Sequence, residues 1–524
     1  MKMKFTLFFV LNFLMGCASV PVSMQDTKSV YTPKITTADF NYDPYKTDIA
    51  KIYNHELKDK KISGAALIDD GVAAFVIRAA FARMATKTID LQTYIYSNDF
   101  SSRILIAELK SAADRGVKVR ILLDDYGTNS DLVDVMLLNN HPNIEVKVFN
   151  VFKYRNRLIH YPQFVFDFNR LNSRMHNKLF IVDNISVITG GRNIGSNYFY
   201  PETSSNFSDT DVLFIGNMAS QSAKHFDQYW NYHRSIPASL FPSTKSKKRM
   251  RKLDEHFAQI QKQARKDVAA YNSIINETLN EYKDKKFDIY WGNGLMLSDA
   301  PEKVEMSRKE KKDHENVIVR ALNKLWRDTK ESVYISAAYF VPGKEGVHDI
   351  ISEEKKGVPV TVVTNSLSST NAPTVYAKWE KYRSGLIESG VEVYEFMKAA
   401  ENNRGKDHDV IKKRSSFSVL HSKTIVFDDK YSWIGSFNLD PRSALYNTEN
   451  VAIFDNPDFA VELRNMIIKD TQTSWHVTRE HGKTYWRGKR PKDANVKTYT
   501  NSPDTTWLWR VWTWITKVVP ESLV

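Results

Sequence analysis

Histidine, lysine and aspartate occur twice in this 524-residue sequence with the same H-x-K-x4-D spacing. The six residues are His176, Lys178 and Asp183 in the first copy and His421, Lys423 and Asp428 in the second, 245 positions later (421 − 176). Cleaving a phosphodiester needs an uncharged nucleophile, cations for the oxygens that gain negative charge, and an acid for the departing alkoxide. Two imidazoles and two ammonium groups supply all of these, so the motifs predict phosphodiester chemistry.

The residues around the two motifs repeat as well. MHNKLFIVD (175–183) corresponds to LHSKTIVFD (420–428), and Gly190 and Asn193 recur as Gly435 and Asn438. Side chains two apart on a strand point the same way, so the histidine and lysine of each copy can reach one phosphate. Each aspartate would hold a histidine ring in one tautomer or pair with a lysine. Packed histidines and solvated lysines are the alternative, but matching flanks favour one site built from two halves.

At these residues the sequence resembles the phospholipase D superfamily, whose signature is a duplicated H-x-K-x4-D followed by G-[SG]-x-N. That second stretch is Gly190-Gly191-Arg192-Asn193 and Gly435-Ser436-Phe437-Asn438. The segments RLNSRMHNK (170–178) and GSFNLDPRSALYNTE (435–449) are most similar to bacterial C-type cardiolipin synthases within it. The resemblance implies an α/β fold of two pseudo-twofold related phospholipase D-like domains, each a mixed β-sheet flanked by helices, with one shared active site.

The resemblance also implies roles for the site residues. His176 would be the nucleophile and His421 the acid and base, although the sequence alone leaves their order open. Four polar residues would hold the phosphate oxygens: Lys178, Lys423, Asn193 and Asn438. Glu449 would orient a histidine of the opposite half, and its first-half counterpart is either Asp209 or Asp211. No cofactor and no metal are expected, since the histidines are used in catalysis and no His/Cys cluster has ligand spacing.

For C-type cardiolipin synthases the implied reaction is transfer of a phosphatidyl group, through a phosphatidyl-histidine, to the hydroxyl of phosphatidylglycerol. Phosphatidylethanolamine is a candidate donor. The expected partners are phospholipids and a bacterial membrane surface; an accessory protein is left open, and nucleic acid is not expected. Three alternatives stay open: a phospholipase D that releases phosphatidic acid, a nuclease with the same signature, and a non-catalytic envelope lipoprotein. Two intact motifs argue against the last.

The apolar pattern indicates the elements that must position these residues. Strands are predicted where apolar residues alternate, over 89–96, 117–123, 144–149, 333–340, 358–363 and 391–396. A helical stretch over 102–115 stops at Gly116, and its counterpart stops at Gly357, 241 positions later (357 − 116). Strands that alternate with helices predict βαβ units. The predicted division is a signal peptide (1–16), a tether (17–60), a first domain (61–240), a basic helical connector ending in a turn-rich stretch (241–303), a second domain (304–480) and a tail (481–524).

The amino terminus predicts export. Lys2 and Lys4 precede an apolar run that is too short to span a bilayer but suits a signal peptide. Leu14-Met15-Gly16-Cys17 resembles a bacterial lipobox, with Cys17, the only cysteine, as the lipidated residue. An ordinary signal with an incidental cysteine is the alternative. We expect a lipid-anchored protein of the bacterial cell envelope that faces the periplasm, with the inner or outer membrane left open.

Charge and the carboxyl terminus favour contact with an acidic surface. The net charge is +13, and basic residues cluster at 245–252, 308–312 and 412–414. Such clusters attract anionic lipid headgroups; nucleic acid is the competing polyanion, and a merely solvated surface is the third interpretation. A helix predicted over 507–519 has two faces, an apolar one with Trp507, Val511, Trp514, Ile515 and Val518 and a polar one with Arg510, Thr513 and Lys517. It would either lie in a membrane interface or dock on its own protein.

Overall fold

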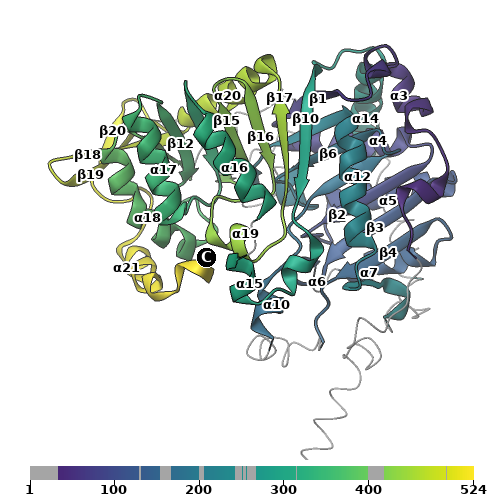
Figure 1. Cartoon of the computed structure of the whole chain (residues 1–524), viewed down its shortest axis with the longest axis horizontal. Coiled ribbons are helices and arrows are strands. Elements are labelled where there is room, and N and C mark those ends of the chain that lie inside the picture. Colours follow the sequence, from purple (N-terminus) through teal and green to yellow (C-terminus); the bar gives the residue numbers. More distant parts are fainter. Residues whose placement is uncertain are drawn as a thin grey trace, which may run out of the picture.

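The computed structural model describes residues 34–128, 132–153, 167–199, 206–241, 251, 255, 267–313, 316–398, 418–490 and 493–523. Within these residues the strands form one sheet of 18 strands and a separate pair, with helices packed on the large sheet (Figure 1). The predicted signal peptide, Cys17, the basic cluster 412–414 and all of the cluster 245–252 except Arg251 lie outside the described residues.

The first half of the chain forms a mixed sheet in the order β9-β4-β3-β2-β5-β6-β8-β1. Its strands are β1 (Ser63–Ile68), β2 (Thr88–Thr93), β3 (Lys118–Asp124), β4 (Ile144–Phe149), β5 (Leu179–Val182), β6 (Ser186–Gly190), β8 (Asp211–Gly216) and β9 (Ser235–Pro237). The strands β2, β3 and β4 are parallel, and the other pairings are antiparallel. Its longer helices are α4 (Gly71–Met84), α5 (Phe100–Asp114), α12 (Asn217–Trp230) and α14 (Asp267–Lys283). Shorter ones are α6 (Asp125–Thr128), α7 (Leu132–Leu137), α10 (Phe168–Asn172) and α11 (Ser196–Phe199).

The second half repeats this topology. The order β17-β16-β15-β11-β12-β13 matches β8-β6-β5-β2-β3-β4, and β18, β19 and β20 extend its far edge. Its strands are β11 (Val333–Ala337), β12 (Val360–Asn365), β13 (Glu392–Phe396), β15 (Lys423–Phe427), β16 (Tyr431–Gly435), β17 (Asn450–Asp455), β18 (Ser474–Glu480), β19 (Lys483–Gly488) and β20 (Lys497–Tyr499). Its helices are α15 (Arg308–Asp313), α16 (Val317–Asp328), α17 (Gly343–Lys355), α18 (Pro373–Glu388), α19 (Pro441–Leu445), α20 (Pro457–Thr471) and α21 (Trp507–Ile515). The predicted α/β fold with two related halves is therefore confirmed.

A strand that the sequence did not predict joins the two halves. The turn-rich stretch expected at the end of the connector is instead β10 (Tyr290–Ser298), which pairs with β1 of the first half and β17 of the second. Gly292 and Gly294 made this segment look like a turn. A Cβ on Gly292 would lie 2.5 Å from the Asp455 carbonyl oxygen, so glycine serves close strand packing here.

Local signals fix the ends of several helices. Gly116 and Gly357 both have positive φ, +98° and +87°, which lets α5 and α17 stop and turn into parallel strands. The Asp99 side chain caps the amino end of α5, and Asn456 caps α20. One apolar core fills the second half and the interface, and a second core lies under α4, α5 and α14 of the first half.

Both ends of the described chain are more tightly packed than predicted. Residues 34–60, expected as a tether, bury Ile49, Ala50, Tyr53 and Leu57 in the first-half core. The expected tail from residue 481 begins with β19 and β20, which continue the second sheet. None of the helices in the described ranges is both long and apolar enough to cross a membrane.

Candidate active site

Each motif histidine lies on a segment that pairs with the other half of the chain. The His176 backbone N–H donates to the Thr448 carbonyl oxygen at 2.8 Å, just before β5. The His421 N–H donates to the Ser208 carbonyl oxygen at 2.7 Å, where β14 (Ser418–Leu420) runs parallel to β7 (Asn206–Ser208). This reciprocal pairing carries each histidine into the interface between the halves, so the two motifs meet in one site.

Each histidine ring is held by a carboxylate of the opposite half. His176 Nδ1 lies 2.8 Å from Glu449 Oε2, and His421 Nδ1 lies 2.6 Å from Asp209 Oδ2. An ionised carboxylate only accepts hydrogen bonds, so each Nδ1 carries the proton and donates it. Nε2 is then the nitrogen left for a substrate, with its lone pair exposed in the neutral ring.

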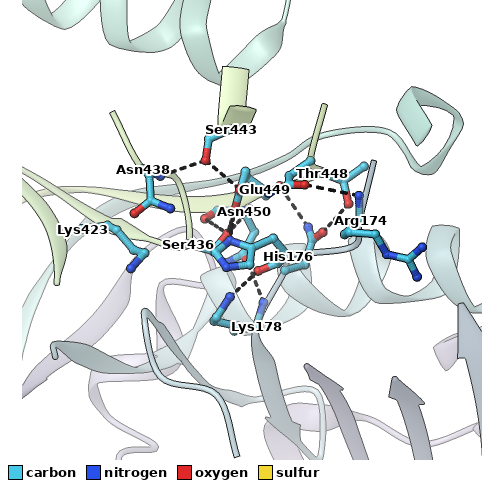
Figure 2. Close-up of polar contacts among 12 residues, drawn as sticks. Arg174, His176, Lys178, Lys423, Ser436, Asn438, Ser443, Thr448, Glu449 and Asn450 are labelled. Atoms are coloured by element: carbon cyan, nitrogen blue, oxygen red, sulfur yellow. Dashed lines mark hydrogen bonds and ion pairs between the residues drawn. The ribbon is translucent and has the colours of Figure 1, made fainter. Parts of the chain in front are cut away.

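Glu449 is fixed in turn by hydroxyl groups of its own half. Ser436 Oγ donates to Glu449 Oε2, and Ser443 Oγ donates to Oε1 at 3.0 Å (Figure 2). The Glu449 backbone N–H donates to the buried Asp299 carboxylate at 3.0 Å, which also pairs with Lys303. Both serines belong to the second-half motif segment, but the sequence did not indicate that their hydroxyls bind this carboxylate.

The two motif lysines are buried close to both histidines. Lys178 Nζ donates to the His176 carbonyl oxygen at 2.6 Å, and Lys423 Nζ donates to the His421 carbonyl oxygen at 2.5 Å. Figure 2 shows Lys423 reaching from the second half toward Lys178 and His176. Burial lowers the pKa of Lys178 to about 7 and that of Lys423 to about 8, partly offset for both lysines by Glu449 and Asp209.

Burial and the two lysines also act on the histidines. They lower the pKa of His176 well below its usual value and lower the pKa of His421 to about 4. Asp209 partly opposes this for His421. Both rings are therefore neutral at pH 7 in the empty site. A bound phosphodiester anion would offset the lysine charges and make it easier for one histidine to carry a second proton.

The two motif asparagines differ in their contacts. Asn193 Oδ1 accepts from the Ile95 backbone N–H at 3.0 Å, and its Nδ2 donates to the Tyr198 hydroxyl at 2.8 Å. Most of its hydrogen-bonding capacity is thus used within the first half. Asn438 is also buried, but its Oδ1 has no hydrogen-bond partner among the residues that the structure describes. In either side chain the amide nitrogen is the atom that could donate to a phosphate oxygen, and that of Asn193 already donates to Tyr198.

The prediction that the motif aspartates orient a histidine or pair with a lysine is wrong. Asp183 accepts the backbone N–H groups of residues 86, 87 and 88 and the Thr86 hydroxyl. Asp428 accepts the backbone N–H groups of residues 330, 331 and 332. Asp183 directly follows β5 and Asp428 directly follows β15, and they adopt positive φ, 51° and 54°. They tie the turn after each of these strands to the start of a neighbouring strand, away from the catalytic groups.

Asp209 and Asp211 were both candidates for orienting a histidine, and only Asp209 does so. Asp211 pairs with Arg78 at 2.8 Å and lies 3.5 Å from Arg192, inside the first half. Side chains two apart on a regular strand would share one side, but Asp209 lies in the break between β7 and β8, whereas Asp211 is the first residue of β8. The Asp209 side chain contacts His421, and the Asp211 side chain contacts the buried arginines.

Aromatic rings outside the two sequence motifs lie against both histidines. Tyr94 meets His176 edge-on at 5.1 Å between ring centroids, and Tyr198 meets His421 at 5.4 Å. The duplication offered one signal, because Tyr94 and Tyr339 are also 245 positions apart (339 − 94). Within the described residues no group of three or more His, Cys, Asp or Glu side chains is arranged to hold a metal ion.

The arrangement suits displacement at a phosphodiester. Two imidazoles with oriented tautomers can serve as nucleophile and proton donor, and two buried cations can hold the phosphate oxygens. The site is assembled only when both halves are in place, because each histidine depends on a carboxylate more than 200 positions away in sequence.

Comparisons with known proteins agree with this geometry. A family model described as cardiolipin synthase, PLD-like domain matches residues 80–230 and 322–471. Cardiolipin synthase C of Escherichia coli is 33% identical over 476 residues, covering 86% of this chain and 94% of that protein. An uncharacterised Helicobacter pylori protein is 40% identical over 99% of both chains.

A solved structure extends the likeness to the whole fold. The phosphatidylserine synthase of Haemophilus influenzae superposes with a TM-score of 0.54 at 12% identity, covering 90% of this chain and all of that one. The duplicated motif, the shared site and these matches agree, and the chain belongs to the phospholipase D superfamily, within the family of cardiolipin synthase PLD-like domains.

Proposed function

We propose that this protein is a phosphatidyltransferase that makes cardiolipin from phosphatidylglycerol and a second phospholipid, with phosphatidylethanolamine as the candidate donor. The observation that carries the proposal is the crossed pair of contacts, His176 with Glu449 and His421 with Asp209, around two buried lysines. The likeness to cardiolipin synthase C of Escherichia coli supports a lipid alcohol as the acceptor.

The reaction proceeds in two displacements at phosphorus. Nε2 of His176 attacks the donor lipid, the bond from phosphorus to the headgroup oxygen breaks, and His421 gives its Nε2 proton to that oxygen. The phosphatidyl-histidine then meets the phosphatidylglycerol hydroxyl, which His421 deprotonates as the P–N bond breaks. Lys178, Lys423 and Asn438 would hold the non-bridging oxygens through both steps.

The two carboxylates support this assignment of roles. Asp209 has a pKa below its usual range, because His421 and Lys423 outweigh the effect of its burial. It therefore stays ionised and can stabilise an imidazolium on His421. Burial raises the pKa of Glu449 to about 7, so Glu449 stabilises an imidazolium on His176 less strongly than Asp209 does on His421.

The test is lipid analysis of bacterial cells that lack their own cardiolipin synthases. Expression of this protein should restore cardiolipin, and His176→Ala should abolish it. A matched control is His348→Ala, which removes an exposed histidine on α17. Phosphatidic acid without cardiolipin would instead identify a hydrolase, and nucleic-acid cleavage without any lipid change would identify a nuclease.

A second assay asks whether the chain acts alone. The purified protein is mixed with phosphatidylglycerol and phosphatidylethanolamine, and cardiolipin is measured with and without a cell extract. Turnover by the purified chain shows that it is sufficient, whereas turnover only with extract points to an accessory protein.

We also propose that the mature protein is anchored by lipid on Cys17 in the cell envelope and faces the periplasm. The lipobox-like Leu14-Met15-Gly16-Cys17 supports this location. Labelled palmitate should be incorporated into the wild-type protein and not into Cys17→Ser. Labelling that persists in the variant would contradict the anchor.

A further inference from the structure

The helix α21 turns its apolar side away from the protein. Its exposed fractions include 64% for Trp507, 61% for Trp512 and 67% for Trp514, and Val518 beyond it is 82% exposed. Residues 507–518 hold seven of the fourteen exposed large apolar side chains in the described part of the chain. The sequence left a membrane interface and docking on the protein as alternatives; the helix docks through its polar side.

Specific contacts keep the helix in this orientation. Thr513 and Thr516 are buried, and Trp509, which lies off the apolar face, packs against the core. Lys378 of α18 donates to the Lys517 carbonyl oxygen at 2.6 Å. The Lys517 ammonium pairs with Glu380, which is also on α18, at 2.7 Å. These contacts hold the exposed tryptophans outward. They would be lost if the helix turned its apolar side toward the protein.

Exposed basic residues of α15 contact the chain beyond α21. Arg308 of α15 donates to Ser522 Oγ at 3.1 Å, in the segment 521–523 that follows α21. Arg308, Lys309 and Lys312 are exposed on α15 and outnumber its exposed acidic residues, Glu310 and Asp313. Tryptophan favours the headgroup region of a bilayer, and each basic residue near an anionic membrane contributes roughly 1 kcal/mol. An exposed apolar helix linked to exposed basic residues through the segment 521–523 matches an anionic lipid surface better than a purely apolar protein partner.

This surface lies on the same side of the molecule as an edge of the active site. The segment after α21, residues 521–523, contacts α19. Ser443 of α19 donates to Glu449, which orients His176. In Figure 1 α21, α15, α19, α10 and α6 all lie along the lower part of the view.

We propose that α21 and α15 form a docking face for the surface of a bilayer that contains anionic phospholipid. Docking brings the edge of the active site next to lipid headgroups. This role of the docking face in catalysis rests on the proposed function. The exposed face of α21 enters the interface, and α15 contacts the headgroups.

The first experiment measures binding to vesicles of phosphatidylglycerol and phosphatidylethanolamine. All proteins are full chains carrying Cys17→Ser, so any contribution of the amino terminus is common to them. Trp512→Ser/Trp514→Ser should lower the partition coefficient about tenfold, since interfacial tryptophans anchor such helices. The control Leu295→Ser/Ile468→Ser removes two exposed apolar side chains elsewhere and should change it less than about twofold.

The second experiment separates charge from apolar contact. Arg308→Gln/Lys309→Gln/Lys312→Gln should weaken binding to the phosphatidylglycerol vesicles at low salt and leave binding to pure phosphatidylcholine vesicles unchanged. The control Lys58→Gln/Lys60→Gln/Lys61→Gln removes three exposed lysines just before β1, far from α21 in Figure 1. It should retain binding.

Three outcomes would overturn the docking face. One is unchanged vesicle binding by Trp512→Ser/Trp514→Ser with an unchanged melting temperature. Another is a parent whose tryptophan fluorescence is not quenched by lipids with brominated chains. The third is a parent dimer, seen by light scattering, that this variant converts to a monomer. Vesicle binding needs no turnover, so a protein that binds but makes no cardiolipin would contradict the proposed function and leave the docking face standing.

Discussion

The two halves of the active site orient their histidines with different carboxylates. Glu449 reaches His176 with a long side chain that Ser436 and Ser443 hold in place. Asp209 reaches His421 with a shorter side chain, and the residue equivalent to Ser436 is Gly191. A Cβ on Gly191 would lie only 2.1 Å from Asp209 Oδ1. The two halves therefore differ at paired positions, because the length of the carboxylate side chain and the size of its neighbour must fit together.

The difference extends to protonation and to the asparagines. Asp209 stays ionised, whereas the pKa of Glu449 is raised to about 7 by burial. Asn193 is hydrogen-bonded within the first half, whereas Asn438 Oδ1 has no partner within the described ranges. Equivalent positions thus have different chemical environments, which supports the proposal that one histidine is the nucleophile and the other the acid.

The largest expected effect is loss of turnover when either histidine is replaced. His176→Ala and His421→Ala should each lower kcat at least about 10⁴-fold, and the double variant should be scarcely worse, because the two groups act in sequence. With a substrate that has a good leaving group, His421→Ala should accumulate an adduct on His176. Mass spectrometry after rapid alkaline denaturation measures it. An adduct on His421 in His176→Ala would reverse the roles.

The next effect tests the pairing of carboxylate and neighbour. Gly191→Ser should lower kcat about 10²-fold, because the new Cβ forces Asp209 away from His421. Ser436→Gly should lower it only about tenfold, since Glu449 keeps the hydrogen bond from Ser443. Steady-state kinetics on a short-chain lipid measures both. Equal losses in the two variants would contradict the asymmetry.

A smaller effect concerns pH. Lys178 and Lys423 have folded pKa values of about 7 and about 8, below the usual 10.5, so the unfolded chain binds more protons between pH 7 and 10. The contribution of these two lysines should therefore raise the melting temperature of the empty protein as pH rises from 7 to 9. Binding of a soluble phosphodiester should weaken over the same interval, because the lysines lose charge while both histidines are already neutral. Lys178→Met should flatten both trends, measured by calorimetry.

The smallest effect on turnover is expected at the two motif aspartates. Asp183→Ala leaves three backbone N–H groups and a hydroxyl without an acceptor at a fully buried position, and should cost about 3 kcal/mol of unfolding free energy. Asp428 is only half-buried, so Asp428→Ala should cost about 1 kcal/mol. Denaturant unfolding measures both. Each variant should keep kcat within about tenfold of wild type at low temperature. A much larger loss of kcat in protein that remains folded would indicate that the aspartate acts directly in catalysis.

The sequence by itself determined the local features. The period of two along extended chain predicts that His176 and Lys178, and likewise His421 and Lys423, lie on one side. The glycines at 116 and 357 end helices because they alone adopt positive φ without cost. The duplicated spacing indicated two similar halves. All of these follow from interactions within a few residues of chain, or from comparing one stretch of sequence with another.

Only the tertiary structure decided which groups meet across the chain. It selects Asp209 over Asp211, turns the motif aspartates toward backbone amides, makes a strand of residues 290–298, and points the tryptophans of α21 outward. These outcomes depend on strand register and on packing between segments tens to hundreds of residues apart. A pattern along the chain shows which face a residue occupies, but not what that face contacts.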